Sequence, residues 1–392
     1  MVLLALCIAR LGLVTSGAMA LKKLNSQSGI PTVVRAISVF SAAALQKQIP
    51  AMCMVTRNLV NFLFFLFGAI TIPSLDRSAL AASEPHKKAE AEGEAMWYCV
   101  MVITDCQMIA DRFMQQHPKI KVRFYRSSDA RLAERIMTEA RAGRFLWDVV
   151  TITAYYGYLL DKRGMLGVYH SPERKYYRDS YKDPKGTWTS TYSNLAVLAY
   201  NSKLVAKEDI PKSLADLLEP KWKREIALVD NAYEWFAVTL ESMGRNKGVS
   251  FMRRLASQNP EIRTGRSLLA GLLAAGEFKI FLSSYSHNIE KDKEKGAPVD
   301  WIALNPVYGN LHPTAISSKA PHPNAARSFV DYLLSRQGQE LLRERWIVPD
   351  RIDVPPNPPR LLEGIKAVHA TPKIYEEFES YIKLFHEIFG VR

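Results

Sequence analysis

The chain has 392 residues, of which 48% are hydrophobic and 23% charged, with 21 Pro, 20 Gly and 4 Cys. This composition excludes a disordered chain, a collagen-like fibre and a small disulfide scaffold, and the length suggests two domains. Lys and Arg outnumber Asp and Glu by 52 to 39, giving a formal net charge of +13. Because the basic residues are interleaved with acidic ones, we expect no nucleic-acid partner.

Residues 54–81 have the three-part layout of a secretory signal peptide. Arg57 precedes an apolar run from Leu59 to Ile72, Pro73 follows the run, and the small residues of 79–81 suit a signal peptidase. The run is shorter than the roughly 20 residues that span a bilayer, so we prefer cleavage over an uncleaved anchor. The chain is therefore expected to be exported to the periplasm.

Residues 1–53 precede this signal peptide, although a signal peptide belongs at the N-terminus. We interpret residues 1–53 as a non-native extension, with translation starting at Met52 or Met54. The alternative is a genuine first hydrophobic segment over residues 1–21.

Two cysteines, Cys99 and Cys106, lie outside the leader. An oxidising compartment permits a bond between them. Cys99 falls in an expected strand and Cys106 at the start of the next helix, so we expect their Cα atoms to lie beyond the roughly 7 Å limit for a disulfide. The sequence therefore predicts two unpaired, buried thiols.

After a polar start over Ser83–Glu94, which we expect to be mobile, the chain alternates between strands and helices. Apolar runs and helical periodicity predict strand, helix, strand, helix and strand in succession. The elements bounded by sequence signals are Met96–Ile103, Lys119–Tyr125, Ala130–Ala142 and Trp147–Thr151. This alternation indicates parallel strands with crossover helices, which is an α/β fold.

The second half repeats the alternation. Strands are expected at 188–201, Ile226–Val229, Lys279–Ser284, Val299–Leu304 and Thr314–Ser317, and helices at Phe236–Met243, Gly248–Ser257, Ser267–Ala275, Pro323–Ser335, Gln337–Arg345 and Ile374–Phe389. No long linker separates the halves, so strands must run between them.

Polar side chains that follow the expected strands are the candidate ligand-binding residues. Ligands of open α/β sheets bind beyond the carboxyl ends of the strands, where helix N-termini also favour anions. The candidates are Ser127, Ser128, Thr151, Thr153, Tyr155, Ser193, Asn194, Asp230, Tyr233, Glu234, Tyr285 and His287. Ser127 and Ser128 suit an anion site and equally suit ordinary helix caps, so both readings stay open.

Several segments in the same order resemble extracellular solute-binding proteins of ABC importers, in the branch that includes ferric-iron-binding proteins. They include FMQQHPKIKV, SSDARLAERIMTEARAG followed by WDVV, LAVLAYN, PKSLADLLEPKWKREIAL and SKAPHPNAARSFVDYLLSRQGQELL. The resemblance covers about Met96 to Pro356. It implies a two-lobed periplasmic-binding-protein architecture (type II, Venus flytrap) with a strand hinge, and a monomer that delivers its solute to a permease in the inner membrane.

The resemblance also implies the division of the chain. Residues 95–195 and 306–345 would form lobe 1, and residues 196–305 and 346–392 would form lobe 2. The hinge would lie near Ser193–Ala199 and Ile302–Val307. A solute would bind in the cleft between the lobes.

The ferric branch coordinates metal with two adjacent tyrosines of the second domain. Tyr285 falls where that pair would lie, but its neighbours are serines, and Tyr155 and Tyr156 lie in the first domain. We therefore expect a small anionic organic solute or a ferric or chelated metal, with Tyr285 and His287 as the metal ligands in the second case. No resident cofactor is expected apart from that ferric ion.

The motifs of common enzymes are absent from the sequence: it has no Walker phosphate loop, no HExxH pair, no GxSxG elbow and no CxxC site. We therefore predict a binding protein. The alternatives are an enzyme on the same clamshell fold, which would turn its ligand over, and a protein that presents its ligand to a membrane sensor.

Overall fold

The computed structural model of the chain describes residues 77–391. The proposed extension at 1–53 and residues 54–76 of the predicted signal peptide (54–81) lie outside the described residues. No helix within 77–391 combines the length and apolarity that a membrane span requires.

The described chain begins with helix α4 (Arg77–Glu92), which packs against α12 (Pro323–Leu334). The Glu92 carboxylate accepts hydrogen bonds from the backbone N–H groups of Asn324 and Ala325, at 2.8 and 2.7 Å. A carboxylate at a helix N-terminus is stabilised by the helix dipole. The expectation of a mobile start over Ser83–Glu94 is therefore wrong: the segment is helical up to Glu92, which is tied to a distant helix, and Glu94 begins β1.

The first half of the described chain is an α/β unit. Its elements are β1 (Glu94–Cys99), α5 (Ile103–Gln116), β2 (Lys121–Arg126), α6 (Asp129–Arg141), β3 (Val149–Thr151), α7 (Ala154–Lys162), β4 (Leu166–Gly167) and the 3₁₀ helices η2 (Pro172–Tyr176) and η3 (Asp179–Tyr181). Strands β2, β1 and β3 are parallel neighbours, as the alternating pattern predicted.

The second half repeats this organisation. Its elements are η4 (Lys207–Asp209), η5 (Leu214–Leu218), η6 (Pro220–Trp222), β6 (Ile226–Val229), α8 (Tyr233–Met243), α9 (Arg245–Ala256), β7 (Glu261–Arg263), α10 (Arg266–Ala275), β8 (Ile280–Tyr285), α11 (Ser286–Glu294) and β9 (Val299–Ile302). Strands β7, β6 and β8 are parallel neighbours.

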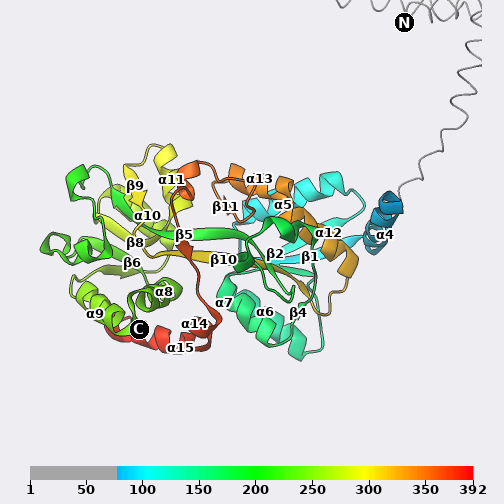
Figure 1. The fold of residues 1–392 in the computed structure, drawn as a ribbon, viewed down its shortest axis with the longest axis horizontal. Helices are drawn as coiled ribbons and strands as arrows, with labels where there is room; N and C mark the ends of the chain where they lie inside the picture. Colours follow the sequence, from blue (N-terminus) through cyan, green and yellow to red (C-terminus); the bar gives the residue numbers. More distant parts are fainter. Residues whose placement is uncertain (1–76, 392) are drawn as a thin grey trace, which may run out of the picture. The chain divides into compact units, whose positions relative to one another are not determined.

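Two long antiparallel strands, β5 (Thr189–Asn201) and β10 (Val307–Ser317), connect the halves (Figure 1). Through them the described strands form one sheet, in the order β2-β1-β3-β10-β5-β8-β6-β7. The expected strand Thr314–Ser317 is only the end of β10. Pro313 would interrupt a regular ladder, but here the register shifts between His312 and Pro313, so the strand continues.

The C-terminal part returns along both halves. It comprises α12, α13 (Arg336–Glu344), β11 (Val348–Pro349), η7 (Pro359–Leu361), β12 (Ala367–Val368), α14 (Pro372–Glu376) and α15 (Phe378–Phe389). Strand β11 pairs with β5 and β12 pairs with β10, so this segment runs beside the two long strands.

Buried apolar side chains form separate cores in the two halves. Two clusters lie on the two faces of the β1–β3 half, around Phe113 and Phe329 on one face and Trp147 on the other. A third cluster surrounds β6 and β8 and includes Phe385 of α15. The helices therefore cover both faces of the sheet, as in a doubly wound α/β protein.

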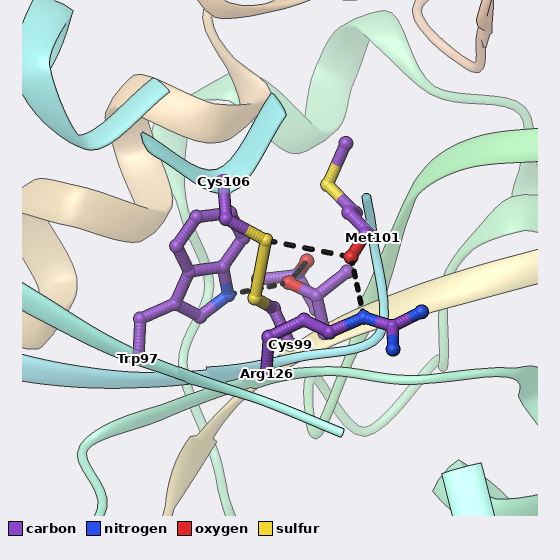
Figure 2. Close-up of a disulfide and its surroundings, with 7 residues drawn as sticks. Trp97, Cys99, Met101, Cys106 and Arg126 are labelled. Carbon is purple, nitrogen blue, oxygen red and sulfur yellow. Dashed lines mark hydrogen bonds between the residues drawn. A yellow bond between two sulfur atoms is a disulfide. The ribbon is translucent and has the colours of Figure 1, made fainter. Parts of the chain in front are cut away.

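The structure joins Cys99 and Cys106 in a disulfide (Figure 2), so the prediction of two unpaired thiols is wrong. Cys99 ends β1 and Cys106 lies in the first turn of α5, which begins at Ile103. The short turn between them folds the helix back over the strand end and brings the sulfur atoms together, although the Cα atoms lie 7.3 Å apart.

This disulfide is expected to stabilise the fold modestly, because the loop it closes is short. Replacing Cys99 and Cys106 together by Ala should lower the free energy of unfolding by roughly 2–3 kcal/mol. Denaturant unfolding of the mature chain measures this, and a reductant should destabilise only the parent protein. A reductant that leaves the parent unchanged would contradict the prediction.

Candidate functional site

A cavity of about 270 Å³ lies against the long strands and is lined by both halves. Tyr192 and Asn194 of β5 and His312 of β10 line its middle. The remaining lining residues are Val100, Met101, Val102, Asp105, Asp129 and Thr153 from the first half, Arg266, Tyr285, His287, Asn288 and Lys291 from the second half, and Arg345 and Ile347 after α13. The cavity is therefore a cleft between the two halves.

Five helices begin at this cleft: α5, α6 and α7 from the first half and α10 and α11 from the second. Residues that begin them or directly precede them, such as Val102, Thr153 and Tyr285, line the cleft. At none of the five N-termini does the side chain of the N-cap residue itself make a capping hydrogen bond, although the Asp129 carboxylate accepts from the backbone N–H of Thr153, the N-cap residue of α7. Since uncapped N–H groups and helix dipoles both favour negative charge, this geometry suits an anion.

The second half adds two cationic side chains. Arg266, the first residue of α10, stacks over the Tyr285 ring at 4.4 Å and donates to the Ser283 carbonyl at 3.3 Å. Among the described residues, no carboxylate lies within ion-pair distance of Arg266 or of Lys291. By contrast, Arg345 is paired with Asp105 at 2.7 Å. Arg266 and Lys291 therefore leave positive charge available to a ligand.

The first half supplies a carboxylate that is already engaged. Asp129 accepts hydrogen bonds from the Thr153 backbone N–H at 2.9 Å and from its hydroxyl at 2.7 Å. Burial raises the pKa of Asp129 above its usual value, although the Thr153 bonds oppose the rise. This pair holds the start of α7 against the start of α6.

Polar atoms at the cleft also lack partners. Asn194 Oδ1 and His287 Nδ1 are buried and make no hydrogen bond to any described residue. Burial, with a smaller contribution from Lys291, lowers the pKa of His287 to about 4, so His287 is neutral at physiological pH. His312 stacks on Tyr192 at 3.9 Å, and burial lowers its pKa to about 3. Neutral imidazoles can donate and accept hydrogen bonds to a polar solute.

Four of the candidate residues line this cleft: Thr153, Asn194, Tyr285 and His287. The Tyr285 hydroxyl accepts a hydrogen bond from Asn310 Nδ2 at 3.3 Å. Because Tyr285 directly precedes α11, its ring lies at a helix N-terminus as well as beside Arg266.

The other candidates lie elsewhere. In the first half, Thr151 is buried between Trp97 and Thr314, and Tyr155 packs on Phe378. The Ser193 hydroxyl donates to Asp350 at 2.6 Å, Tyr233 is hydrogen-bonded to His386, and Asp230 accepts from the Thr264 hydroxyl. Ser127 donates its backbone N–H to the Cys99 carbonyl, and Ser128 is the exposed residue directly before α6. Ser127 and Ser128 do not line the cleft, whereas their neighbour Asp129 does.

Glu234, in the first turn of α8, lies within electrostatic reach of the cleft. Burial and, to a smaller degree, the Asp129 carboxylate raise its pKa to about 7 against the opposing effect of Arg266. Because the pKa of Glu234 in the folded protein is above the usual 4.5 of the unfolded chain, the native state binds the proton of this acid more tightly than the unfolded state does. The stability that this acid contributes is therefore full below pH 4.5 and is lost as the pH rises through 7.

Replacing Glu234 by Gln should remove this pH dependence. Between pH 4.5 and 7 the parent should lose roughly 1–3 kcal/mol more unfolding free energy than the Gln variant. Denaturant titrations across this range measure the difference. Parallel pH profiles for the two proteins would show that Glu234 titrates normally.

Sequence reasoning did not find Arg266, Lys291, Asp129, Tyr192 and His312. A signal for Arg266 exists: Gly265 precedes it with a positive φ of 99°, which marks a turn directly before a helix. Tyr192 and His312 face each other across paired strands, and this register could not be read from the sequence.

Two α/β halves joined by paired strands, with a polar cleft where helix N-termini meet, define a two-lobed ligand-binding protein. Residues 159–369 match the family model of bacterial extracellular solute-binding proteins, and the chain belongs to this family. The predicted fold class and the prediction of a solute-binding receptor for an ABC importer are confirmed. Membership of a solute-binding family agrees with the prediction that this chain is a binding protein and not an enzyme.

The chain is 24% identical over 274 residues to an uncharacterized protein of Haemophilus influenzae, covering 64% of this chain and 76% of that protein. It is 22% identical over 173 residues to an Fe(3+)-binding periplasmic protein of Serratia marcescens, covering 42% of this chain and about half (51%) of that relative.

Similar solved structures include the periplasmic binding protein AfuA and the protein HitA. AfuA from Actinobacillus pleuropneumoniae, with fructose-6-phosphate bound, has a TM-score of 0.65 at 23% identity, over 76% of this chain and 99% of that one. Iron-bound HitA from Pseudomonas aeruginosa has a TM-score of 0.66 at 22% identity, over 75% and 99% of the two chains. These similarities show the fold of the chain and do not identify its solute.

Proposed function

We propose that this protein captures a small anionic organic solute, such as a phosphorylated sugar or a carboxylate, in the cleft between its lobes. The observation that carries the proposal is the meeting of the N-termini of α5, α6, α10 and α11, whose N-cap side chains make no capping hydrogen bond, with Arg266 and Lys291, neither of which has an acidic partner among the described residues. A multiply charged oxyanion can accept hydrogen bonds from N–H groups and from a guanidinium together.

The lobes of this proposal are residues 95–195 with 306–345 and residues 196–305 with 346–392. The distribution of the buried cores supports most of this division, since residues from β6 to α11 share a core with α15 while α12 and α13 share one with β1 and α5. Ile347 departs from it, because it packs in the core of the first half. Strands β5 and β10 would then act as the hinge. Binding shifts the population from open to closed lobes, and the closed form docks on an inner-membrane permease.

A chelated ferric ion is the second candidate, because Tyr285 and His287 line the same cleft. Within residues 77–391, no group of three or more His, Cys, Asp and Glu side chains could hold a metal ion. Tyr285 is flanked by serines, so a second phenolate does not adjoin it. A bare ferric ion would find few ligands here, whereas a chelator held by Arg266 could supply the missing ones.

Native mass spectrometry of protein purified without refolding, together with metal analysis, tests the proposal. We expect one equivalent of an organic anion, and titrations should show binding among fructose 6-phosphate, citrate and related anions. Ferric citrate is the probe for the second candidate. Stoichiometric binding of ferric ion without any chelator, and of none of the anions, would contradict the proposal.

The proposed periplasmic location rests on the predicted signal peptide. N-terminal mass spectrometry of the exported protein should find a mature N-terminus near Ala82. Recovery of peptides that precede Met52 would show that residues 1–53 belong to the protein.

A further inference from the structure

A second cavity, of about 330 Å³, lies on the opposite face of β5 from the cleft. Successive strand residues point to opposite faces, so Tyr192 and Asn194 line the cleft while Ser193 and Leu195 line this cavity. Its other wall is the segment 350–363, which we call the strap. The cavity thus has the size of a small-molecule site and lies directly behind the proposed hinge.

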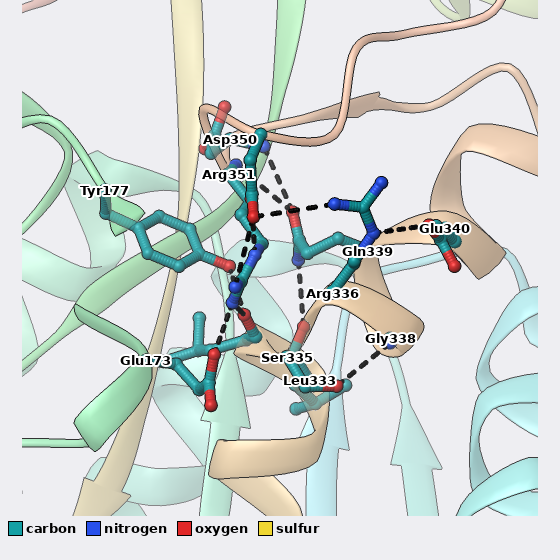
Figure 3. Close-up of polar contacts among 12 residues, drawn as sticks. Glu173, Tyr177, Leu333, Ser335, Arg336, Gly338, Gln339, Glu340, Asp350 and Arg351 are labelled. Carbon is teal, nitrogen blue, oxygen red and sulfur yellow. Dashed lines mark hydrogen bonds and ion pairs between the residues drawn. The ribbon is translucent and has the colours of Figure 1, made fainter. Parts of the chain in front are cut away.

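One end of the strap is fixed to the first half (Figure 3). Arg351 is buried, forms ion pairs with Glu173 and with Asp353 (2.6 Å), and donates to the Leu334 carbonyl at 3.0 Å. The Gln339 side chain accepts hydrogen bonds from the backbone N–H groups of Asp350 and Arg351. These contacts hold the start of the strap on η2, α12 and α13.

The other end of the strap is fixed to the second half. Arg360 pairs with Asp300 and with Glu290, each at 2.6 Å, and stacks over Trp301 at 4.6 Å. Between the anchors the sequence is VPPNPP, residues 354–359. Proline-rich segments are extended and semi-rigid, so the strap cannot absorb lobe motion without changing its path over the cavity.

The cavity combines apolar walls with four charged residues. Of these, Arg351 is already paired with Glu173 and Asp353, and Glu363 is exposed, which leaves Asp350 and Arg178 as the two opposite charges. Asp350 is buried at 6% exposure; its Oδ1 accepts from the Ser193 hydroxyl, and its Oδ2 has no hydrogen-bond partner among the described residues. The nearby Ser190 hydroxyl donates instead to the Tyr192 carbonyl. Burial raises the pKa of Asp350 to about 7, against the effects of both serines and of Arg178.

Arg178 supplies the positive charge opposite Asp350 in the lining of this cavity. It is exposed, and among the described residues it forms no ion pair, although it lies near enough to lower the pKa of Asp350. A gap wider than an ion pair therefore separates the two charges. Leu195, Val354 and Leu362 line the space around it.

We propose that this cavity is a second ligand site, which binds a small zwitterion with an apolar side chain, such as a free aliphatic amino acid. Its ammonium would pair with Asp350, its carboxylate with Arg178, and its side chain would lie against the apolar walls. The site is separate from the cleft, with which it shares no lining residue. Because the strap is anchored on both halves, occupancy of this site changes the affinity of the cleft, and the reverse holds to the same degree.

Calorimetric titration of the mature protein with L-leucine tests the site. Leucinamide lacks the carboxylate and 4-methylpentanoate lacks the ammonium, so each should bind at least about tenfold more weakly than leucine. Arg178→Met should weaken leucine binding by a similar factor and should fold, because Arg178 is exposed. Asp350→Asn should do the same, and the exposed Arg254→Met is the matched control.

Arg266→Met distinguishes this site from the cleft. It should leave the affinity for leucine within about threefold of the parent value, whatever it does to anion binding. Loss of leucine binding in Arg266→Met, retention of full affinity in Arg178→Met, or no leucine binding to the parent protein would each overturn the proposal. The first of these results would place the amino acid in the cleft and would contradict the proposed cleft solute as well.

Discussion

Replacing Arg266 by Met is expected to weaken the binding of the anionic solute by roughly 10- to 100-fold, because a charge-assisted hydrogen bond contributes about 1.5–3 kcal/mol. Met keeps an apolar stem and removes the guanidinium, which stacks over Tyr285. Calorimetric titration with the anion retained by the purified protein measures the effect. Arg266→Lys should lose less, since it keeps the charge but not the planar donor fork.

Arg254→Met is the matched control for this prediction. Arg254 is an exposed Arg of α9 in the same half of the chain, away from the residues that line the cleft. Its loss should change the affinity by less than about threefold, or ~0.7 kcal/mol. If the affinity of Arg266→Met for the anion also stayed within about threefold of the parent value, the solute would not contact Arg266.

Replacing Arg351 by Met is expected to cost about 3 kcal/mol of unfolding free energy. Arg351 is 5% exposed, pairs with Glu173 and Asp353, and lies 3.9 Å from the Tyr176 ring centre. Its removal leaves those acids and the Leu334 carbonyl without their buried partner. Denaturant unfolding at neutral pH measures the loss.

Arg336→Met is the matched control for this variant. Arg336 pairs with Glu340 at 2.9 Å and lies 3.8 Å from the strap residue Asp353, but its side chain is 61% exposed. Exposed pairs contribute at most about 1 kcal/mol. Equal losses in the two variants would show that Arg351 does not anchor the strap.

The order of strands and helices could be predicted from the sequence because local patterns decide it. The apolar run Ile226–Val229 is a strand with the expected bounds, and α6 begins one residue before the predicted start. The pairing of Cys99 with Cys106 could not be predicted, because it depends on where α5 begins after the strand. The expected terminal helix Ile374–Phe389 is two helices, α14 and α15, which are separated at Glu377.

The candidate site was predictable to the extent that it follows strand ends. Tyr285, His287 and Thr153 were identified because each follows a strand in a parallel arrangement. Thr151 and Tyr233 have the same sequence signal, but side chains from distant elements satisfy their hydroxyls. Arg266 and Asp350 gain their importance from partners far along the chain, and single-sequence patterns carry no information on such contacts.

Small-angle X-ray scattering of the mature chain, with and without the anion that binds most tightly, tests the capture of a solute between lobes most directly. Saturation should decrease the radius of gyration as the halves close, and Arg266→Met at the same anion concentration should keep the value of the free protein. Saturable binding to the parent protein with no change in the radius of gyration would contradict the account.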